Sequence, residues 1–224
     1  YDLKICLIEK EHDVALHSST RNSGVIHYPF YIDPKKKKNF ARAAFLSHDM
    51  WKVLANENNI PWVQGGTIEI ALDEEQHKTL EKYMVLGKEN GLTEEDISIL
   101  DSNELKQKEP NLNCHSGLYC TKEGSTNYGL LTKAVSELSK KNGTNFLLKH
   151  NAKYIEETSK QVNIIFSDNS SLTANFVINC AGGNSLDVAK KFRLLKDYSD
   201  LHFRGEYWVA DSNIANLVKT NIYT

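Results

Sequence analysis

Hydrophobic and polar positions follow strand-like and helix-like spacings along most of the chain. Short apolar runs rich in β-branched residues, typical of strands buried in a parallel sheet, occur at 3–8 and 176–180. The stretch 62–72 alternates apolar and polar residues around a Gly-Gly bend, which predicts a further strand. More strands are predicted at 117–121, 146–149, 153–157, 162–166, around Leu172 and at 201–210.

Helical spacing of apolar residues predicts helices between these strands. They are expected after the lysines at 35–38, through Leu54, and at 73–91, 101–109 and 128–142. The helices alternate with strands, but several strands also follow one another directly. This order predicts an α/β layer with a parallel sheet and an antiparallel sheet inserted between its pieces, α+β overall.

Composition excludes several classes of protein. Of 224 residues, 27 are Lys or Arg and 29 are Asp or Glu, so the formal net charge is −2. A near-neutral chain has no general attraction for nucleic acid, and we expect no nucleic-acid partner. The four lysines at 35–38 are interpreted as the solvated start of a helix. No apolar run is long enough to span a bilayer.

The cysteines and histidines predict neither a disulfide framework nor a metal site. The four cysteines form no C-x-x-C pair, and the eight histidines have no zinc-type spacing. This use of cysteine favours a reducing compartment, so a cytoplasmic location is expected.

Two predicted strands end in residues suited to a nucleotide cofactor. Glu9 closes the first strand, and a carboxylate at the carboxyl end of a parallel strand can accept both ribose hydroxyls. No G-x-G-x-x-G turn precedes it, so a solvated strand end is the alternative. Gly182 and Gly183 follow the strand at 176–180 and permit close approach of a ligand, or form an ordinary turn.

The segment 17–27 combines small hydroxyl side chains with Arg21, Gly24 and His27. Hydroxyls and glycine leave backbone N–H groups accessible to an anion, and arginine binds phosphate or carboxylate through two parallel hydrogen bonds. His27 has the chemistry of a general base, although a single histidine also occurs in purely structural roles. Only four arginines occur in the chain, which draws attention to Arg21 and Arg204.

Taken together and in this order, these stretches resemble the FAD-dependent oxidoreductases of the D-amino-acid-oxidase superfamily. Within it, they are most similar to the L-2-hydroxyglutarate dehydrogenases and oxidases. The matching stretches are IEKE at 8–11, S-x-R-N-S-G-V-I-H at 19–27, EP at 109–110, INCAGG at 178–183 and FRGEY at 203–207.

The resemblance implies a Rossmann-like FAD/NAD(P)-binding domain with an inserted, mainly antiparallel β-sheet substrate domain. The FAD-binding domain is expected at 1–60 and 122–193, and the substrate-binding domain at 61–121 and 194–224. Family members carry a glycine-rich turn before the matched region and a long segment after it. Both domains are therefore expected to be incomplete in this chain.

The resemblance also implies roles for individual residues. Glu9 is expected to bind the adenosine ribose, Ala152 to meet the adenine, and His27 to act as the base beside the flavin. Arg204 is a candidate for the substrate carboxylate. The pyrophosphate and flavin side of FAD is expected to contact Ser19, Arg21, Asn22, Ser23, Ala181 and Gly182.

The implied reaction is oxidation of a small 2-hydroxy acid such as L-2-hydroxyglutarate to the 2-oxo acid, with hydride transfer to flavin N5. Oxygen, a quinone or a protein then accepts the electrons, in the cytoplasm or at the periphery of the inner membrane. The alternatives are an FAD-dependent glycerol-3-phosphate dehydrogenase, an amine or amino-acid oxidase, or a binding or scaffold protein without cofactor. Residues 28–31 lack the family's usual glycine, which leaves the substrate open.

Overall fold

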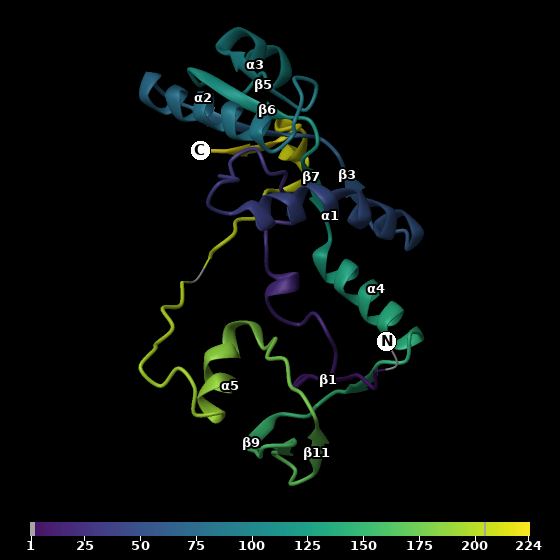
Figure 1. Ribbon diagram of the computed structural model, residues 1–224. Helices are drawn as coiled ribbons and strands as arrows, with labels where there is room; N and C mark the ends of the chain where they lie inside the picture. The colour runs from purple at the N-terminus through teal and green to yellow at the C-terminus, as the bar shows by residue number, and fades with distance from the viewer. Residues whose placement is uncertain (1–2, 204) are drawn as a thin grey trace. The chain divides into compact units, whose positions relative to one another are not determined.

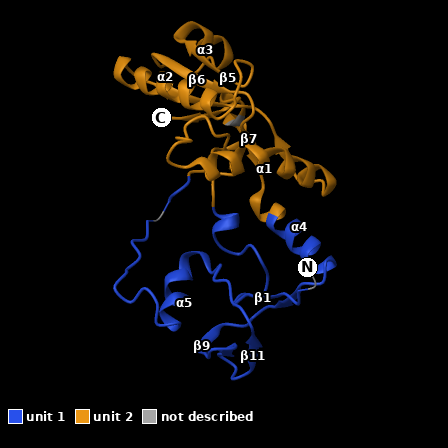
Figure 2. Cartoon of the chain, in the orientation of Figure 1, with its two compact units in different colours: residues 1–21, 132–207 blue, residues 22–131, 208–224 orange. Residues whose placement is uncertain are grey.

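The computed structural model describes residues 3–203 and 205–224 (Figure 1). The chain forms two compact units (Figure 2). The first contains residues 1–21 and 132–207, and the second contains 22–131 and 208–224. Each unit has its own sheets and its own buried apolar clusters.

The second unit contains a four-stranded mixed sheet. Its strands lie in the order β12 (Asn221–Tyr223), β4 (Thr67–Ala71), β6 (Ser116–Cys120) and β5 (Ile97–Asp101). Strand β6 is antiparallel to both of its neighbours, whereas β12 adds to β4 in parallel. Side chains alternate along each strand, so the sheet presents two separate faces.

One face of this sheet packs against a short helix. Ile68 and Ile70 point to this face and contact Leu105. Leu105 lies on α3 (Ser102–Lys108), and the Asp101 carboxylate caps the helix by accepting two backbone N–H groups of its first turn. The predicted helix at 101–109 is thus confirmed.

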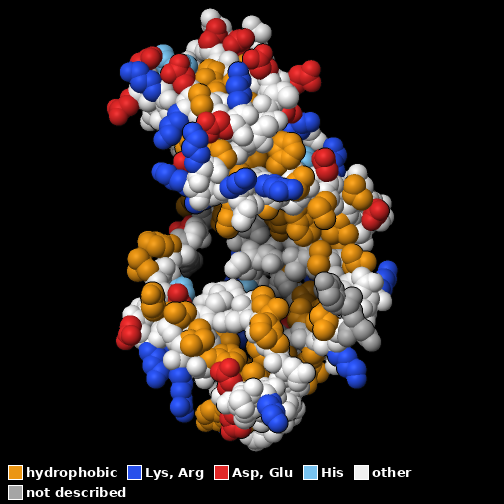
Figure 3. Space-filling model, viewed as in Figure 1, with side chains coloured by type: hydrophobic (Ala, Val, Ile, Leu, Met, Phe, Trp, Pro, Cys, Tyr) orange, Lys and Arg blue, Asp and Glu red, His pale blue; other side chains and the backbone are white. Residues whose placement is uncertain are grey.

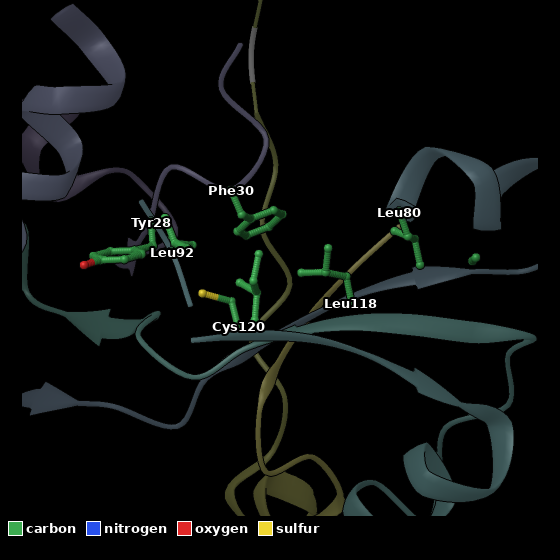
Figure 4. Packing of buried hydrophobic residues seen from close by; sticks show 8 residues of the cluster. Tyr28, Phe30, Leu80, Leu92, Leu118 and Cys120 are labelled. Carbon is green, nitrogen blue, oxygen red and sulfur yellow. The ribbon is translucent and has the colours of Figure 1, made fainter. Parts of the chain in front are cut away.

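The opposite face of the sheet carries the larger apolar cluster. It is covered by α2 (Glu74–Glu89), whose first turn is capped by Asp73, and by the loop that follows strand β2 (Val25–Ile26). The buried residues of this cluster include Tyr28, Phe30, Leu80, Leu92, Leu118 and Cys120 (Figure 4).

The helix expected after the four lysines is α1 (Lys38–Glu57). It buries Ala41, His48 and Ala55, which lie seven residues apart and therefore form one stripe along the helix. The Nε2 atom of His48 lies 2.9 Å from the backbone oxygen of Lys122, and this contact attaches the helix to the bend between β6 and β7.

A second sheet of this unit has the order β2, β7 (Gly124–Thr126) and β3 (Trp62–Val63), with antiparallel pairing throughout. The strand predicted at 62–72 is split between β3 and β4, because Gly66 turns the chain with a φ of +79°. At Gly124, a Cβ atom would collide with the Val63 carbonyl oxygen, so only glycine lets these strands approach so closely.

The first unit contains a parallel pair and an antiparallel sheet. Its strands are β1 (Cys6–Ile8), β8 (Asn145–Leu147), β9 (Ala152–Glu157), β10 (Val162–Phe166) and β11 (Ser171–Ala174). Strand β1 pairs with β8 in parallel, and β10 lies between β9 and β11. The helices are α5 (Ser185–Lys191) and most of α4 (Tyr128–Lys141), which continues into the second unit.

Two predicted strands, 176–180 and 201–210, are wrong where the structure describes them. Phe176 is 79% exposed and Trp208 is 98% exposed. An apolar run forms a strand only when a neighbouring strand accepts its hydrogen bonds, and within the described residues neither run has one. The apolar side chains of these two runs are consequently exposed, and apolar side chains are visible on the surface in Figure 3.

Candidate active site

The pairing of two short strands brings a histidine and a glutamate together. In the antiparallel register of β2 and β7, Val25 faces Ser125 and Ile26 faces Gly124. The next pair outward in this register is His27 and Glu123, and their Nδ1 and Oε1 atoms are 3.6 Å apart. The Glu123 side chain is 1% exposed, whereas the His27 side chain is 44% exposed. A buried carboxylate therefore faces an imidazole that remains accessible.

Glu123 is held by two neutral donors besides His27. The Tyr28 backbone N–H donates to Oε1 at 2.5 Å, and the Thr67 hydroxyl donates to Oε2 at 2.6 Å. A buried carboxylate is costly unless it accepts such hydrogen bonds. The two bonds also fix its orientation toward the imidazole.

This arrangement raises the pKa of His27 above its usual value of 6.5. The hydrogen bond with Glu123 is the main cause, partial burial opposes it, and the charges of Glu123 and Glu69 add to the rise. A histidine with a raised pKa holds a proton more strongly, which suits a group that must accept one from a substrate.

Two tyrosines and a second carboxylate complete the cluster around His27. The ring centroids of Tyr31 and Tyr223 lie 5.9 Å and 5.7 Å from that of His27. Tyr223, on β12, is the register partner of Glu69 on β4. Burial is the main cause that raises the pKa of Tyr223 to about 12, and the charge of Glu123 adds to the rise. At neutral pH both phenols therefore remain protonated donors, since burial also raises the pKa of Tyr31.

Glu69 is partly buried, and its pKa is raised first by burial and then by the charge of Glu123. Replacing it in Glu69→Gln removes one of the negative charges that raise the pKa of His27. We expect the pKa of His27 to fall, as measured by NMR titration of the His27 ring protons. Glu94→Gln changes an exposed residue paired with Lys88 and should leave the pKa of His27 unchanged. A His27 pKa that stays fixed or rises in Glu69→Gln would contradict this electrostatic picture.

The residues expected to contact the adenosine lie in the first unit, near one end of its parallel strand pair. Glu9 follows β1, and its backbone N–H donates to the Leu147 oxygen at 2.9 Å. Its carboxylate accepts the Glu11 N–H at 2.9 Å. The Glu9 carbonyl oxygen accepts the His150 N–H at 3.0 Å, and Ala152 begins β9 two residues later. The structure thus brings Glu9 and Ala152 to the same loop region.

The other predicted cofactor residues are divided between the units. Ser19 lies in a 3₁₀ turn (Ser18–Thr20), which the exposed Arg21 follows, and both belong to the first unit. Asn22 and Ser23 belong to the second unit with His27. Arg204 lies outside the described residues.

The glycines after residue 180 lie in open space. Gly182 begins a second 3₁₀ turn (Gly182–Asn184) with a φ of +56°, and Asn179 Oδ1 accepts the Ala181 N–H at 3.2 Å. A Cβ atom at Gly182 or Gly183 would meet no other atom within 4 Å. Three features of the first unit fit a dinucleotide such as FAD. They are the open space at Gly182, the Glu9 carboxylate after a parallel strand, and the exposed Arg21 among hydroxyl side chains.

Sequence reasoning missed Glu123, Glu69, Tyr31 and Tyr223. Glu123 stands between a predicted strand and a predicted helix, and only the pairing of β7 with β2 gives it a role. A usable signal was the acidic residue in the otherwise apolar run Ile68-Glu69-Ile70, since a charge in a buried strand needs a reason.

The described residues contain neither a candidate metal site nor a candidate membrane-spanning helix. No group of three or more His, Cys, Asp or Glu side chains among them is placed to hold a metal ion. None of the helices they form has the length and apolar character required to cross a membrane.

Several solved structures and curated proteins are similar to this chain. L-alpha-glycerophosphate oxidase from Mycoplasma pneumoniae, solved with FAD bound, superposes with a TM-score of 0.75 at 24% identity, covering 85% of this chain and 50% of its own. Glycine oxidase from Geobacillus kaustophilus gives a TM-score of 0.72 at 17% identity, over 85% of this chain and 52% of its own. These likenesses confirm the predicted mixed α/β, Rossmann-like fold class.

In sequence, the chain is 31% identical to the mitochondrial L-2-hydroxyglutarate dehydrogenase of Caenorhabditis briggsae, over 99% of the chain and 51% of that protein. It is 29% identical to a glycerol 3-phosphate dehydrogenase of Caloramator mitchellensis, over 100% of the chain and 46% of that protein. The chain thus spans about half the length of these relatives. The family model described as DAO, FAD dependent oxidoreductase, matches residues 1–222, and the chain belongs to this family.

Proposed function

We propose that this chain forms part of an enzyme that oxidises a small 2-hydroxy acid of the L-2-hydroxyglutarate class to the 2-oxo acid. The observation that carries the proposal is the pairing of the accessible His27 imidazole with the buried Glu123 carboxylate. Family membership and the similarity to L-2-hydroxyglutarate dehydrogenases support the same reaction.

FAD is the proposed cofactor, and bound FAD supplies the acceptor for the hydride that leaves C2 of the substrate. Glu9 would bind its ribose, Ala152 would meet the adenine, and Arg21 would pair with the pyrophosphate. Ala181 and Gly182 would lie against the cofactor with their backbone, and at Gly182 a Cβ atom would find only open space. The remaining contacts are assigned to Ser19, Asn22 and Ser23.

His27 is proposed to accept the substrate hydroxyl proton as the C2 hydride departs. The products of the step are the 2-oxo acid, a protonated His27 and the reduced cofactor, so charge and electrons balance. Glu123 stabilises the imidazolium that forms, because its hydrogen bond and charge both favour the protonated ring. Arg204 is proposed to bind the substrate carboxylate, for which the planar guanidinium is suited.

Glycerol 3-phosphate is the second candidate substrate. Two observations favour it: the 29% identity to the Caloramator enzyme and the structural likeness to the Mycoplasma oxidase. Oxidation of its secondary hydroxyl would use the same base and the same cofactor. The final electron acceptor is proposed to be oxygen, a quinone or another protein, with the enzyme in the cytoplasm or at the periphery of the inner membrane.

Anaerobic reduction of the FAD-loaded enzyme separates these candidates. We expect L-2-hydroxyglutarate to bleach the flavin absorbance faster than its D-enantiomer, glycerol 3-phosphate or an L-amino acid. Faster bleaching by glycerol 3-phosphate would replace the proposal with the second candidate. Faster bleaching by an amino acid would assign an oxidase of CH–NH₂ donors, and a correctly folded protein that binds no flavin would overturn both candidates.

A further inference from the structure

The glutamate of the Glu109-Pro110 pair is buried and binds a distant part of the chain. Glu109 follows α3 as its C-terminal cap and is 1% exposed. Its Oε1 atom accepts the Lys219 N–H at 2.9 Å, the Thr220 N–H at 2.6 Å and the Thr220 hydroxyl at 2.8 Å. Its Oε2 atom accepts the Lys219 N–H at 3.2 Å. One carboxylate therefore satisfies three donors that stand immediately before β12.

Strand β12 depends on such an attachment because it is short and lies at the edge of its sheet. It contains three residues, and only β4 pairs with it among the described strands. The chain that leads to it forms a 3₁₀ helix (Ser212–Leu217) after an irregular stretch. Asn111, in the loop after Glu109, adds a hydrogen bond from its side-chain amide to the Leu217 oxygen at 3.0 Å.

The position of β12 sets the position of Tyr223. The parallel register places Asn221 beside Thr67 and Tyr223 beside Glu69. This register places the centroid of the Tyr223 ring 5.7 Å from the centroid of the His27 ring. Tyr223 lies three positions after the donor Thr220, so a shift of the backbone at 219–220 moves the tyrosine with it.

We propose that Glu109 is a positioning residue: its buried carboxylate fixes the backbone at 219–220 and so holds Tyr223 against His27. The effect of Glu109 on catalysis rests on the proposed function of His27, whereas its effect on the position of Tyr223 does not. Glu109 itself acts only through the strand, and its role is geometric.

The chemistry of the contact predicts different results for two substitutions. Glu109→Gln keeps an oxygen in the place of Oε1 and loses only the longer contact to Oε2. Glu109→Ala leaves two backbone N–H groups and one hydroxyl without their acceptor. The alanine variant should therefore release β12, and the glutamine variant should largely retain it.

Hydrogen exchange and NMR on the FAD-loaded protein test this without relying on turnover. In Glu109→Ala we expect amide exchange at residues 219–223 to rise about tenfold or more, with no change in the β5–β6 ladder. The ring protons of His27 should shift as they do in Tyr223→Ala, and the double variant should add no further shift. Glu109→Gln should resemble the parent protein in both measurements. Leu80→Ala, a cavity in the apolar cluster of the other sheet face, controls for general destabilisation and should not reproduce the pattern.

Thr220→Val removes one of the three donors to the Glu109 carboxylate. It should also raise amide exchange at 219–223 and shift the His27 ring protons, by smaller amounts than Glu109→Ala. This variant replaces Glu109→Ala in the test if the alanine variant does not fold. The proposal is overturned when 219–223 exchange faster but the His27 signals stay unchanged, or when Glu109→Gln behaves like Glu109→Ala. In Glu109→Ala, flavin reduction should be about tenfold slower, because Tyr223 is displaced from its position beside His27. If no 2-hydroxy acid reduces the flavin in any variant, the proposed function fails while the exchange and NMR results still decide the role of Glu109.

Discussion

Replacing His27 with alanine is expected to slow the reduction of enzyme-bound FAD by the 2-hydroxy acid by a factor of about 10² or more. The imidazole is the accessible member of the pair with Glu123, and alanine leaves no group there to accept the hydroxyl proton. The measurement is the rate of flavin bleaching in anaerobic stopped flow at saturating substrate. The flavin spectrum of the variant should match that of the parent enzyme, because His27 is assigned to the substrate and not to the cofactor.

His115 offers a matched control within the same unit. Its side chain is 45% exposed, close to the 44% of His27, and its Nε2 atom lies 3.3 Å from a Glu74 carboxylate oxygen. His115→Ala therefore removes a histidine of equal exposure that also faces a carboxylate. The rate of bleaching should stay unchanged in this variant. An unchanged rate in His27→Ala as well would remove His27 from the role of base.

The rate of flavin reduction by the parent enzyme should depend on pH through the protonation of His27. A base must be neutral to accept a proton, so the rate should fall as pH drops through the pKa of His27. Because Glu123 and Glu69 raise this pKa, the midpoint should lie above the usual 6.5 of histidine. His27→Ala should lose this acidic limb from its pH profile.

The periodic elements of the fold were predictable because local spacing determines them. The helices α2 and α3 and the strand β10 were predicted to within about two residues of their ends. Their capping residues and their periodic apolar positions are defined by residues that are close together in the sequence. The strands predicted at 176–180 and 201–210 were wrong because apolar character alone does not supply a pairing partner.

The candidate site was predictable only in its accessible residue. His27 stands in a recognisable motif, but its partner Glu123 lies 96 positions away, and only the antiparallel pairing of two short strands joins them. Tyr223 reaches the site through β12, a three-residue strand without a periodic signal. Contacts between segments so distant along the chain leave no trace in local spacing, whereas Glu109-Pro110 was visible as a motif and gained a role only from its contacts.

Removing the carboxylate of Glu123 is expected to have the largest effect on stability. Glu123→Ala leaves the Tyr28 N–H and the Thr67 hydroxyl buried without an acceptor. Each unsatisfied buried donor costs about 1–3 kcal/mol, so the free energy of unfolding should fall by about 2–6 kcal/mol. Urea unfolding followed by circular dichroism measures this loss. A loss well below 1 kcal/mol would show that water or another group replaces the carboxylate.

Glu123→Gln separates the charge of this residue from its shape, because the amide keeps the size and one accepting oxygen. A histidine whose pKa is raised by folding stabilises the protein below its unfolded pKa of about 6.5, and this contribution disappears as pH rises through the folded value. The parent protein should therefore exceed Glu123→Gln in stability by more at pH 6 than at pH 9. Glu81→Gln, at an exposed glutamate 3.9 Å from His77, should change stability little at either pH. An equal difference at both pH values would mean that Glu123 acts on the fold through its hydrogen bonds alone, and His27 would then lack the electrostatic support that its role as a base requires.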